Sequence, residues 1–215
     1  SIQTNIDRYI ISSISEDMTR VSSLRTGEND MIISVPYEQL ETLQGTEGVK
    51  VDQIDGSTAY WIGIECGEGY IFNDPNLRQA VSESIDRATI AESIYGLADP
   101  LYWLVPPYCN AYDESAIGQY YQYDPDHARE LVANSDYDGT PIRLIAVNSF
   151  AKSTELSQAM VSMLQDAGFQ VDLRMIEHSA LNETRNSGDY DIFISNAAFD
   201  SDASYWIQIQ VGNNR

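Results

Sequence analysis

Residues that could carry out covalent chemistry are few in this sequence. Neither of the two histidines, His127 and His178, lies in a nucleophile motif, and no Gly-x-Ser-x-Gly elbow is present. A serine or cysteine nucleophile needs a base within hydrogen-bonding reach, and no sequence pattern here supplies one. We interpret both histidines as surface or helix-capping residues, and the sequence predicts that the protein is not an enzyme.

Metal and cofactor signatures are also absent from the sequence. Cys66 and Cys109 are far apart, and neither a Cys-x-x-Cys nor a His-x-x-x-His pattern occurs. The stretch from Asp200 to Asp202 resembles the start of a calcium loop but lacks its glycine and its distal glutamate. No glycine-rich phosphate loop follows a strand. We therefore predict no metal and no cofactor, and leave open whether the two cysteines form a disulfide or remain thiols.

A carboxylate near the end of a predicted strand is the best candidate for ligand binding. Residues 190–195 are typical of a buried strand, and Asp200 follows shortly after it. Ligands of open α/β sheets bind beyond the carboxyl ends of the strands, where this carboxylate could pair with an ammonium group. Asp200 could instead cap a helix over residues 200–206, and the local sequence favours that cap.

An aromatic loop is the second candidate. Residues 96–112 are irregular and contain Tyr102, Trp103 and Tyr108. Long structured loops on an α/β scaffold are often functional, but such a loop can also cover the core with its own apolar side chains. The residues leave both interpretations open.

Alternating strands and helices must position these residues. A strand over 142–147, a helix over 151–167 and an alternating strand that follows Gly168 predict a βαβ unit. A helix over 178–187 leads to the strand at 190–195. Two further strands are predicted at residues 30–34 and 58–64, and two helices begin at Asp-Pro pairs, at residues 74–75 and 124–125. The pattern predicts a single α/β lobe over residues 1–215, with a mostly parallel mixed sheet flanked by helices.

Charge and composition limit the partners. The 215 residues include 33 Asp and Glu against 12 Lys and Arg, for a net charge of −21, so nucleic acid and anionic membranes are disfavoured. No apolar run reaches membrane-spanning length, and no signal peptide is present. Because the chain starts at Ser1 and stops just after the apolar stretch 204–211, we expect it to be a piece of a longer protein.

Several motifs, in order, resemble one protein family. They are the passage at residues 20–30, the stretch from Phe72-Asn-Asp-Pro to Ile85-Asp-Arg87, Gly96-Leu-Ala-Asp-Pro100 with Val105-Pro-Pro107, Tyr123-Asp-Pro125 with Tyr137-Asp-Gly139, and Gly188-Asp-Tyr-Asp191. They are similar to the oligopeptide- and dipeptide-binding proteins of ABC importers, family 5 of the bacterial extracellular solute-binding proteins. The resemblance covers nearly the whole chain.

The resemblance implies a C-terminal lobe of a two-lobed, type II periplasmic-binding-protein-like fold that closes on its ligand. It implies that Asp200 holds the α-amino group of a peptide. The family commonly has Gly-Trp before this aspartate, whereas this chain has Asn196 and Ala197. Other aromatic side chains would then form the walls of the cleft. The expected ligand-binding residues are Asp200, Phe199, Asn196, Tyr102, Trp103 and Tyr108.

The partners implied by the resemblance are a peptide or peptide-like solute and the membrane subunits of an ABC importer. The protein is expected to be an extracytoplasmic, membrane-tethered monomer. Two alternatives stay open. The scaffold could bind a nickel chelate, an oligosaccharide or an opine-like compound, or it could be a ligand-sensing domain of a signalling or regulatory protein.

Overall fold

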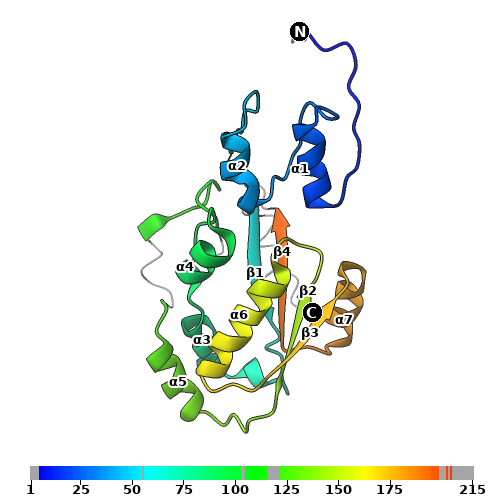
Figure 1. Cartoon of the computed structure of the whole chain (residues 1–215). Helices are drawn as coiled ribbons and strands as arrows, with labels where there is room; N and C mark the ends of the chain where they lie inside the picture. The colour runs from blue at the N-terminus through cyan, green and yellow to red at the C-terminus, as the bar shows by residue number, and fades with distance from the viewer. Residues whose placement is uncertain are drawn as a thin grey trace. The chain divides into compact units, whose positions relative to one another are not determined.

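The computed structural model describes residues 5–54, 56–102, 105–115, 122–198, 202 and 204. The chain forms two compact units, Ser1–Asp55 and Gly56–Arg215 (Figure 1). The single lobe over residues 1–215 stays a prediction.

The first unit is small and helical. It contains α1 (Asp17–Arg25), the short 3-10 helix η1 (Tyr37–Gln39) and α2 (Leu40–Gln44). Helix α1 begins where the Glu16 carboxylate accepts hydrogen bonds from the backbone amides of Met18 and Thr19. The prediction of a strand at residues 30–34 is wrong, because this segment forms no β-ladder with any other described segment.

The second unit is built on a four-stranded sheet. Its strands are β1 (Thr58–Ile64), β2 (Ile142–Val147), β3 (Val171–Ile176) and β4 (Ile192–Ala198). They lie in the order β1-β4-β2-β3. Strand β2 pairs in parallel with both β3 and β4, and β1 pairs antiparallel with β4. The predicted mostly parallel mixed sheet is confirmed.

Helices cover both faces of the sheet. Helix α6 (Ser153–Asp166) connects β2 to β3, and the 3-10 helix η5 (His178–Ala180) with α7 (Leu181–Ser187) connects β3 to β4. The two connections run in opposite directions across the sheet, so right-handed crossovers place α6 and α7 on opposite faces. In Figure 1, α3, α5 and α6 lie on one side of the strands and α7 on the other.

The remaining helices begin as the sequence predicts. Asp74 and Asp124 accept hydrogen bonds from the backbone amides of Asn76 and His127, at 2.8 Å and 3.0 Å. In each case a proline at the first helical position has no N–H to satisfy. These helices and their neighbours are η2 (Ile71–Asn73), α3 (Pro75–Ser84), α4 (Arg87–Ile90), the π-helix η3 (Ala91–Tyr95) and α5 (Pro125–Ala133). None of the helices in the described part of the chain has the length and apolar character needed to cross a lipid bilayer.

The core of the second unit lies between the central strands and α6. Leu144 of β2 and Ile192 of β4 are fully buried, and the predicted apolar face of α6 packs inward. Strand β3 lies at the edge of the sheet, and Met175 is exposed there. The predicted alternation of buried and exposed side chains therefore does not hold at Met175. Strand β3 has a neighbouring strand on one side only, which leaves this side chain open to water.

Candidate ligand-binding site

Four chain segments meet at one edge of the sheet. Because β2, β3 and β4 are parallel, their carboxyl ends lie at the same edge. Strand β1 is antiparallel, so its first residue, Thr58, pairs with Ala198, the last residue of β4. This carboxyl edge is where ligands of open α/β sheets bind.

Tyr108 is held at the carboxyl edge. Its hydroxyl donates a hydrogen bond of 2.8 Å to the backbone oxygen of Ser57, the residue before β1. Partial burial raises the pKa of the Tyr108 phenol, mainly by desolvation, so the hydroxyl remains a donor at neutral pH. The residue is still 44% exposed, which leaves aromatic surface available to a ligand.

Tyr102 also lies next to this edge. Its neighbour Leu101 packs against Ala59 of β1, and Ala197 of β4 packs against the same residue. The guanidinium carbon of Arg87 lies 5.8 Å from the centre of the Tyr102 ring, in a cation–π contact. Desolvation by burial lowers the pKa of Arg87. The aromatic loop thus reaches the end of β4, where we expected the binding site.

Asn196 belongs to the same edge through the strand register. It pairs with Tyr60 of β1, so the two side chains share one face of the sheet. The Tyr60 ring stacks on Tyr95 with centroids 4.6 Å apart and packs against Phe150 at 5.2 Å. This aromatic group was missed by sequence reasoning. Among these residues, Phe150 alone could have been predicted near the site, because it lies in the loop directly after the predicted strand β2.

Two polar side chains extend the edge toward β3. The side-chain amide nitrogen of Asn148 donates a hydrogen bond of 2.7 Å to the Glu177 carboxylate. The backbone N–H of Asn148 donates a hydrogen bond of 3.0 Å to the backbone oxygen of Ile176. Asn148 follows β2 and Glu177 follows β3, so the two loops are joined at the carboxyl edge. Sequence reasoning selected neither residue.

Three expected ligand-binding residues lie outside the described residues. They are Trp103, Phe199 and Asp200. In the sequence they include the two residues that directly follow Ala198, the last residue of β4, and Trp103, which follows Tyr102. Their roles stay predictions. Tyr102, Tyr108 and Asn196 are brought to this edge by the contacts described above.

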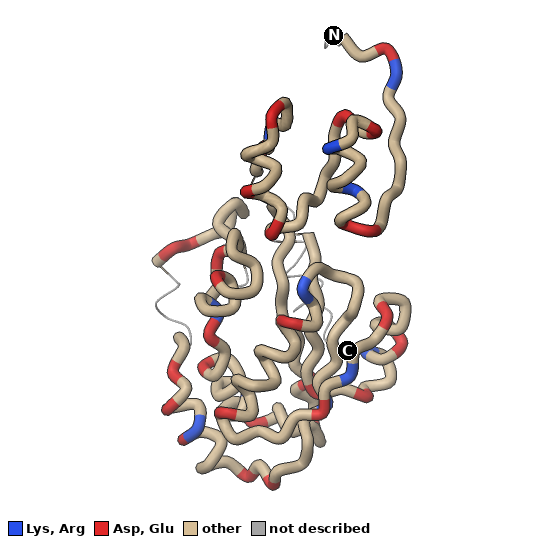
Figure 2. The backbone as a smooth tube through the Cα atoms, in the orientation of Figure 1, with Lys and Arg blue, Asp and Glu red and all other residues tan. Residues whose placement is uncertain are grey.

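Acidic residues dominate the charge of the described chain, as Figure 2 shows. Within residues 5–54, 56–102, 105–115 and 122–198, no group of three or more His, Cys, Asp or Glu side chains is placed to hold a metal ion. Both cysteines are described and are not joined to each other. Cys66 is exposed and Cys109 is buried. The negative field would favour a ligand that carries positive charge.

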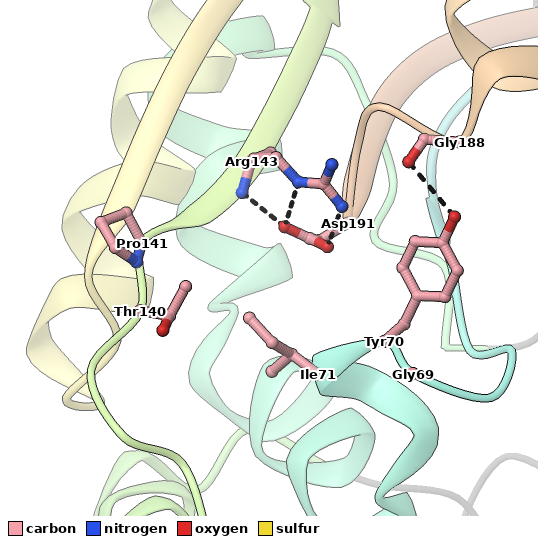
Figure 3. Close-up of a pocket in the computed structure, with 8 residues that line it drawn as sticks. All are labelled: Gly69, Tyr70, Ile71, Thr140, Pro141, Arg143, Gly188 and Asp191. Atoms are coloured by element: carbon pink, nitrogen blue, oxygen red, sulfur yellow. Dashed lines mark hydrogen bonds and ion pairs between the residues drawn. The ribbon is translucent and has the colours of Figure 1, made fainter.

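A cavity of about 400 Å³ lies at the opposite edge of the sheet, near the amino ends of β2 and β4 (Figure 3). The buried Asp191 carboxylate accepts hydrogen bonds from the Arg143 backbone N–H at 2.8 Å and from its Nε and Nη2 atoms at 3.0 and 2.7 Å. These bonds raise the pKa of Arg143. The Tyr70 hydroxyl donates to the Gly188 oxygen at 3.3 Å. Because these groups bond to one another, they hold the sheet together and are poorly placed to bind a solute.

His127 packs between two helices. Its Nδ1 atom lies 2.7 Å from a carboxylate oxygen of Glu83, which is buried on α3. Gln79 donates to the other oxygen of Glu83 at 2.8 Å. His127 is partly exposed, as a surface histidine should be, but the contact with Glu83 gives it a structural role in joining α5 to α3.

Comparison with known proteins identifies the family. The model for bacterial extracellular solute-binding proteins, family 5 Middle, matches residues 3–214. The chain belongs to this family. Its members are bacterial extracellular solute-binding proteins.

Individual relatives of this family 5 protein are distant. The probable peptide ABC transporter periplasmic-binding protein y4tO of Sinorhizobium fredii is 20% identical over 226 residues, covering 97% of this chain and 42% of that protein. Heme-binding protein A of Haemophilus influenzae is 27% identical over 136 residues, covering 63% of this chain and 24% of that protein. The chain thus spans less than half the length of these relatives.

A solved structure shares the fold. The periplasmic binding protein DppA of Helicobacter pylori, in complex with the peptide STSA, matches with a TM-score of 0.76 at 23% identity. The match covers 91% of this chain and 38% of that protein. The predicted type II periplasmic-binding-protein-like fold is confirmed by this likeness.

Proposed function

We propose that this chain is one lobe of a two-lobed protein that captures a peptide or peptide-like solute for an ABC-type importer. The ligand lies between the carboxyl edge of the sheet and a second lobe, and closure of the two lobes buries it. In this proposal the protein works outside the cytoplasm as a membrane-tethered monomer, hands its ligand to the importer's membrane subunits and catalyses no reaction.

One observation carries the proposal. Tyr108 bonds to Ser57 beside the start of β1, and the start of β1 pairs with the end of β4. Asp200 comes two residues after Ala198, so it follows the strand end to which the aromatic loop is fixed. In the proposal, Asp200 binds the ligand ammonium group, and Asn196, Phe199, Tyr102, Trp103 and Tyr108 form the wall around it.

The experiment is calorimetric titration of the full-length protein with di- to pentapeptides. Replacing Asp200 with Asn keeps the side-chain size and removes the charge. A charge-assisted hydrogen bond contributes about 1.5–3 kcal/mol, so we expect affinity to fall about 10- to 150-fold. The matched control is Asp202→Asn, since Asp202 is an exposed carboxylate and accepts a hydrogen bond from the backbone N–H of Ser204 at 2.9 Å.

Peptides with an acetylated amino terminus provide the second comparison. They should bind the unmodified protein about as weakly as free peptides bind the Asp200→Asn variant, because either change removes one partner of the same pair. No binding across a broad peptide library, or equal affinities for the Asp200→Asn and Asp202→Asn variants, would contradict the proposal.

A non-peptide solute on the same scaffold is the second candidate function. The likeness to heme-binding protein A of Haemophilus influenzae favours testing heme directly. A heme titration followed by absorbance separates the two candidates. Saturable heme binding together with failure of all peptides would support this second function.

A further inference from the structure

The surface of the described chain carries charge of almost one sign. Twenty-six of the thirty-one aspartate and glutamate residues that the structure describes are exposed. Of the eleven lysine and arginine residues in the same part of the chain, five are exposed. The formal net charge of −21 therefore lies largely on the surface.

Several of the basic side chains are turned to the interior. Arg78 is half-buried, and its Nη1 atom donates to the backbone oxygens of Phe72 and Asn73 at 2.7 and 2.9 Å. Arg143 is also half-buried and bonds to the buried Asp191 carboxylate at 2.7 Å. These guanidinium groups stabilise parts of the backbone and one buried carboxylate. They add little positive charge to the surface, where the acidic side chains lie.

The exposed carboxylates are spread along the chain. Figure 2 shows Asp and Glu on helices and loops of both units. On α5, Asp126 and Glu130 are exposed and lie one helical turn apart, where like charges repel. Asp136 and Asp138 are exposed in the loop that follows. A basic protein partner would cover one face only, so this distribution favours dissolved cations as the source of the opposite charge.

The spacing of these charges makes their repulsion sensitive to salt. Side chains one helical turn apart have Cβ atoms about 5–6 Å apart. The Debye length is about 10 Å at about 0.1 M salt and about 3 Å at about 1 M, so neighbouring carboxylates repel at the lower concentration and are largely screened at the higher one. A large net charge destabilises a compact state through this repulsion, and unfolding relieves it because the charges move apart.

We propose that the native structure of this chain depends on high ionic strength, at which dissolved cations screen its surface carboxylates. The protein then works in a saline medium, and its folded state loses stability as the salt is diluted. The inference goes beyond the proposed function and does not rest on it. It uses only the charge of the described surface, and it holds whichever solute is bound.

Hydrogen exchange of the full-length protein at two salt concentrations tests the inference. The amides of β2 and β4 report on the stability of this part of the molecule, because these two strands lie at the centre of the sheet and are buried. Relative to an unstructured peptide in the same buffer, they should exchange at least about 10-fold faster in about 0.1 M than in about 2 M sodium chloride. Equal protection at the two concentrations would overturn the inference.

A variant with fewer charges separates screening from the other effects of salt. Salts can also stabilise a folded protein because they are excluded from its surface, which needs no charge repulsion. The triple variant Glu68→Gln, Glu130→Gln and Asp172→Asn removes three exposed carboxylates and keeps the side chains close to their original size. Because less repulsion remains to be screened, the salt-dependent change in exchange should be smaller than in the unmodified protein.

The opposite triple variant provides the matched comparison. Gln53→Glu, Gln158→Glu and Gln170→Glu add three carboxylates at exposed positions, again with little change in side-chain size. This variant should show a larger salt-dependent change in exchange than the unmodified protein, because more repulsion must be screened. Equal salt dependence in the two triple variants would show that the salt acts by exclusion from the surface, and would overturn the inference.

Discussion

Removing the charge of Asp191 should destabilise the protein more than removing that of its neighbour Asp189. The Asp191 side chain is 4% exposed and bonds to Arg143 through three nitrogen atoms. Breaking a buried ion pair by changing one partner costs about 3–5 kcal/mol. Asp189 is 55% exposed and pairs with both Arg143 and Arg174.

The expected magnitude for Asp191→Asn is lower than the full cost of a broken buried pair. The Arg143 side chain is 35% exposed, so water can solvate its guanidinium once the partner charge is gone. The amide oxygen of Asn can still accept one hydrogen bond. We therefore expect a loss of about 2–3 kcal/mol in the free energy of unfolding. For a chain of this size the melting temperature would fall by about 4–12 °C.

Urea unfolding followed by circular dichroism and fluorescence measures this loss, with Asp189→Asn as the control. The control should lose less, because its carboxylate is partly solvated in the folded state. A loss below about 0.5 kcal/mol for Asp191→Asn, or a loss no larger than that of the control, would refute the assigned role of this pair.

Two further substitutions test local features of the fold. In Gly188→Ala the new Cβ atom would clash with the Tyr70 hydroxyl at a φ of +69°, whereas at Gly139, with a φ of +86°, it would meet nothing within 4 Å. Thermal unfolding should therefore show a larger loss for Gly188→Ala than for Gly139→Ala, and equal losses would contradict the clash. Hydrogen bonds from the backbone N–H of Thr89 and then from its hydroxyl lower the pKa of Asp86 below its usual value of 3.8. Its stabilising effect is thus fully present above about pH 4 and is lost as the pH falls through the lowered pKa, so the stability difference between wild type and Asp86→Asn should shrink between pH 7 and pH 3. A difference independent of pH would contradict this reasoning.

Features fixed by neighbouring residues could be predicted from the sequence. The Asp-Pro pairs place the starts of α3 and α5 because capping depends on residues within one turn. The βαβ unit follows from apolar periodicity and from Gly168, which ends the helix with a φ of +104°. The strand predicted at residues 58–64 is β1 of the structure.

Features fixed by distant partners could not be predicted. Residues 30–34 have the composition of a strand, but a strand forms only where another segment pairs with its backbone. Arg143 and Asp191 are 48 positions apart and meet only because β2 and β4 are neighbours in the sheet. For the same reason, the pairing of Asn196 with Tyr60 could not be predicted, because it depends on the register between β1 and β4.

The candidate site was predicted in outline only. The rule for open α/β sheets and the family resemblance selected Asn196, Tyr102 and Tyr108, and the structure places all three near the carboxyl edge. Arg87 and Phe150 were missed, because their contacts depend on the packing of segments that are separate in the sequence.

A hydrogen-exchange footprint of bound peptide on the full-length protein tests the central claim most directly. We expect a saturating peptide to slow exchange around residues 57–59, 101–109 and 196–200, and to leave residues 69–71 and 188–191 unchanged. Protection confined to residues 69–71 and 188–191 would place the ligand in the cavity at the opposite edge and would contradict the account.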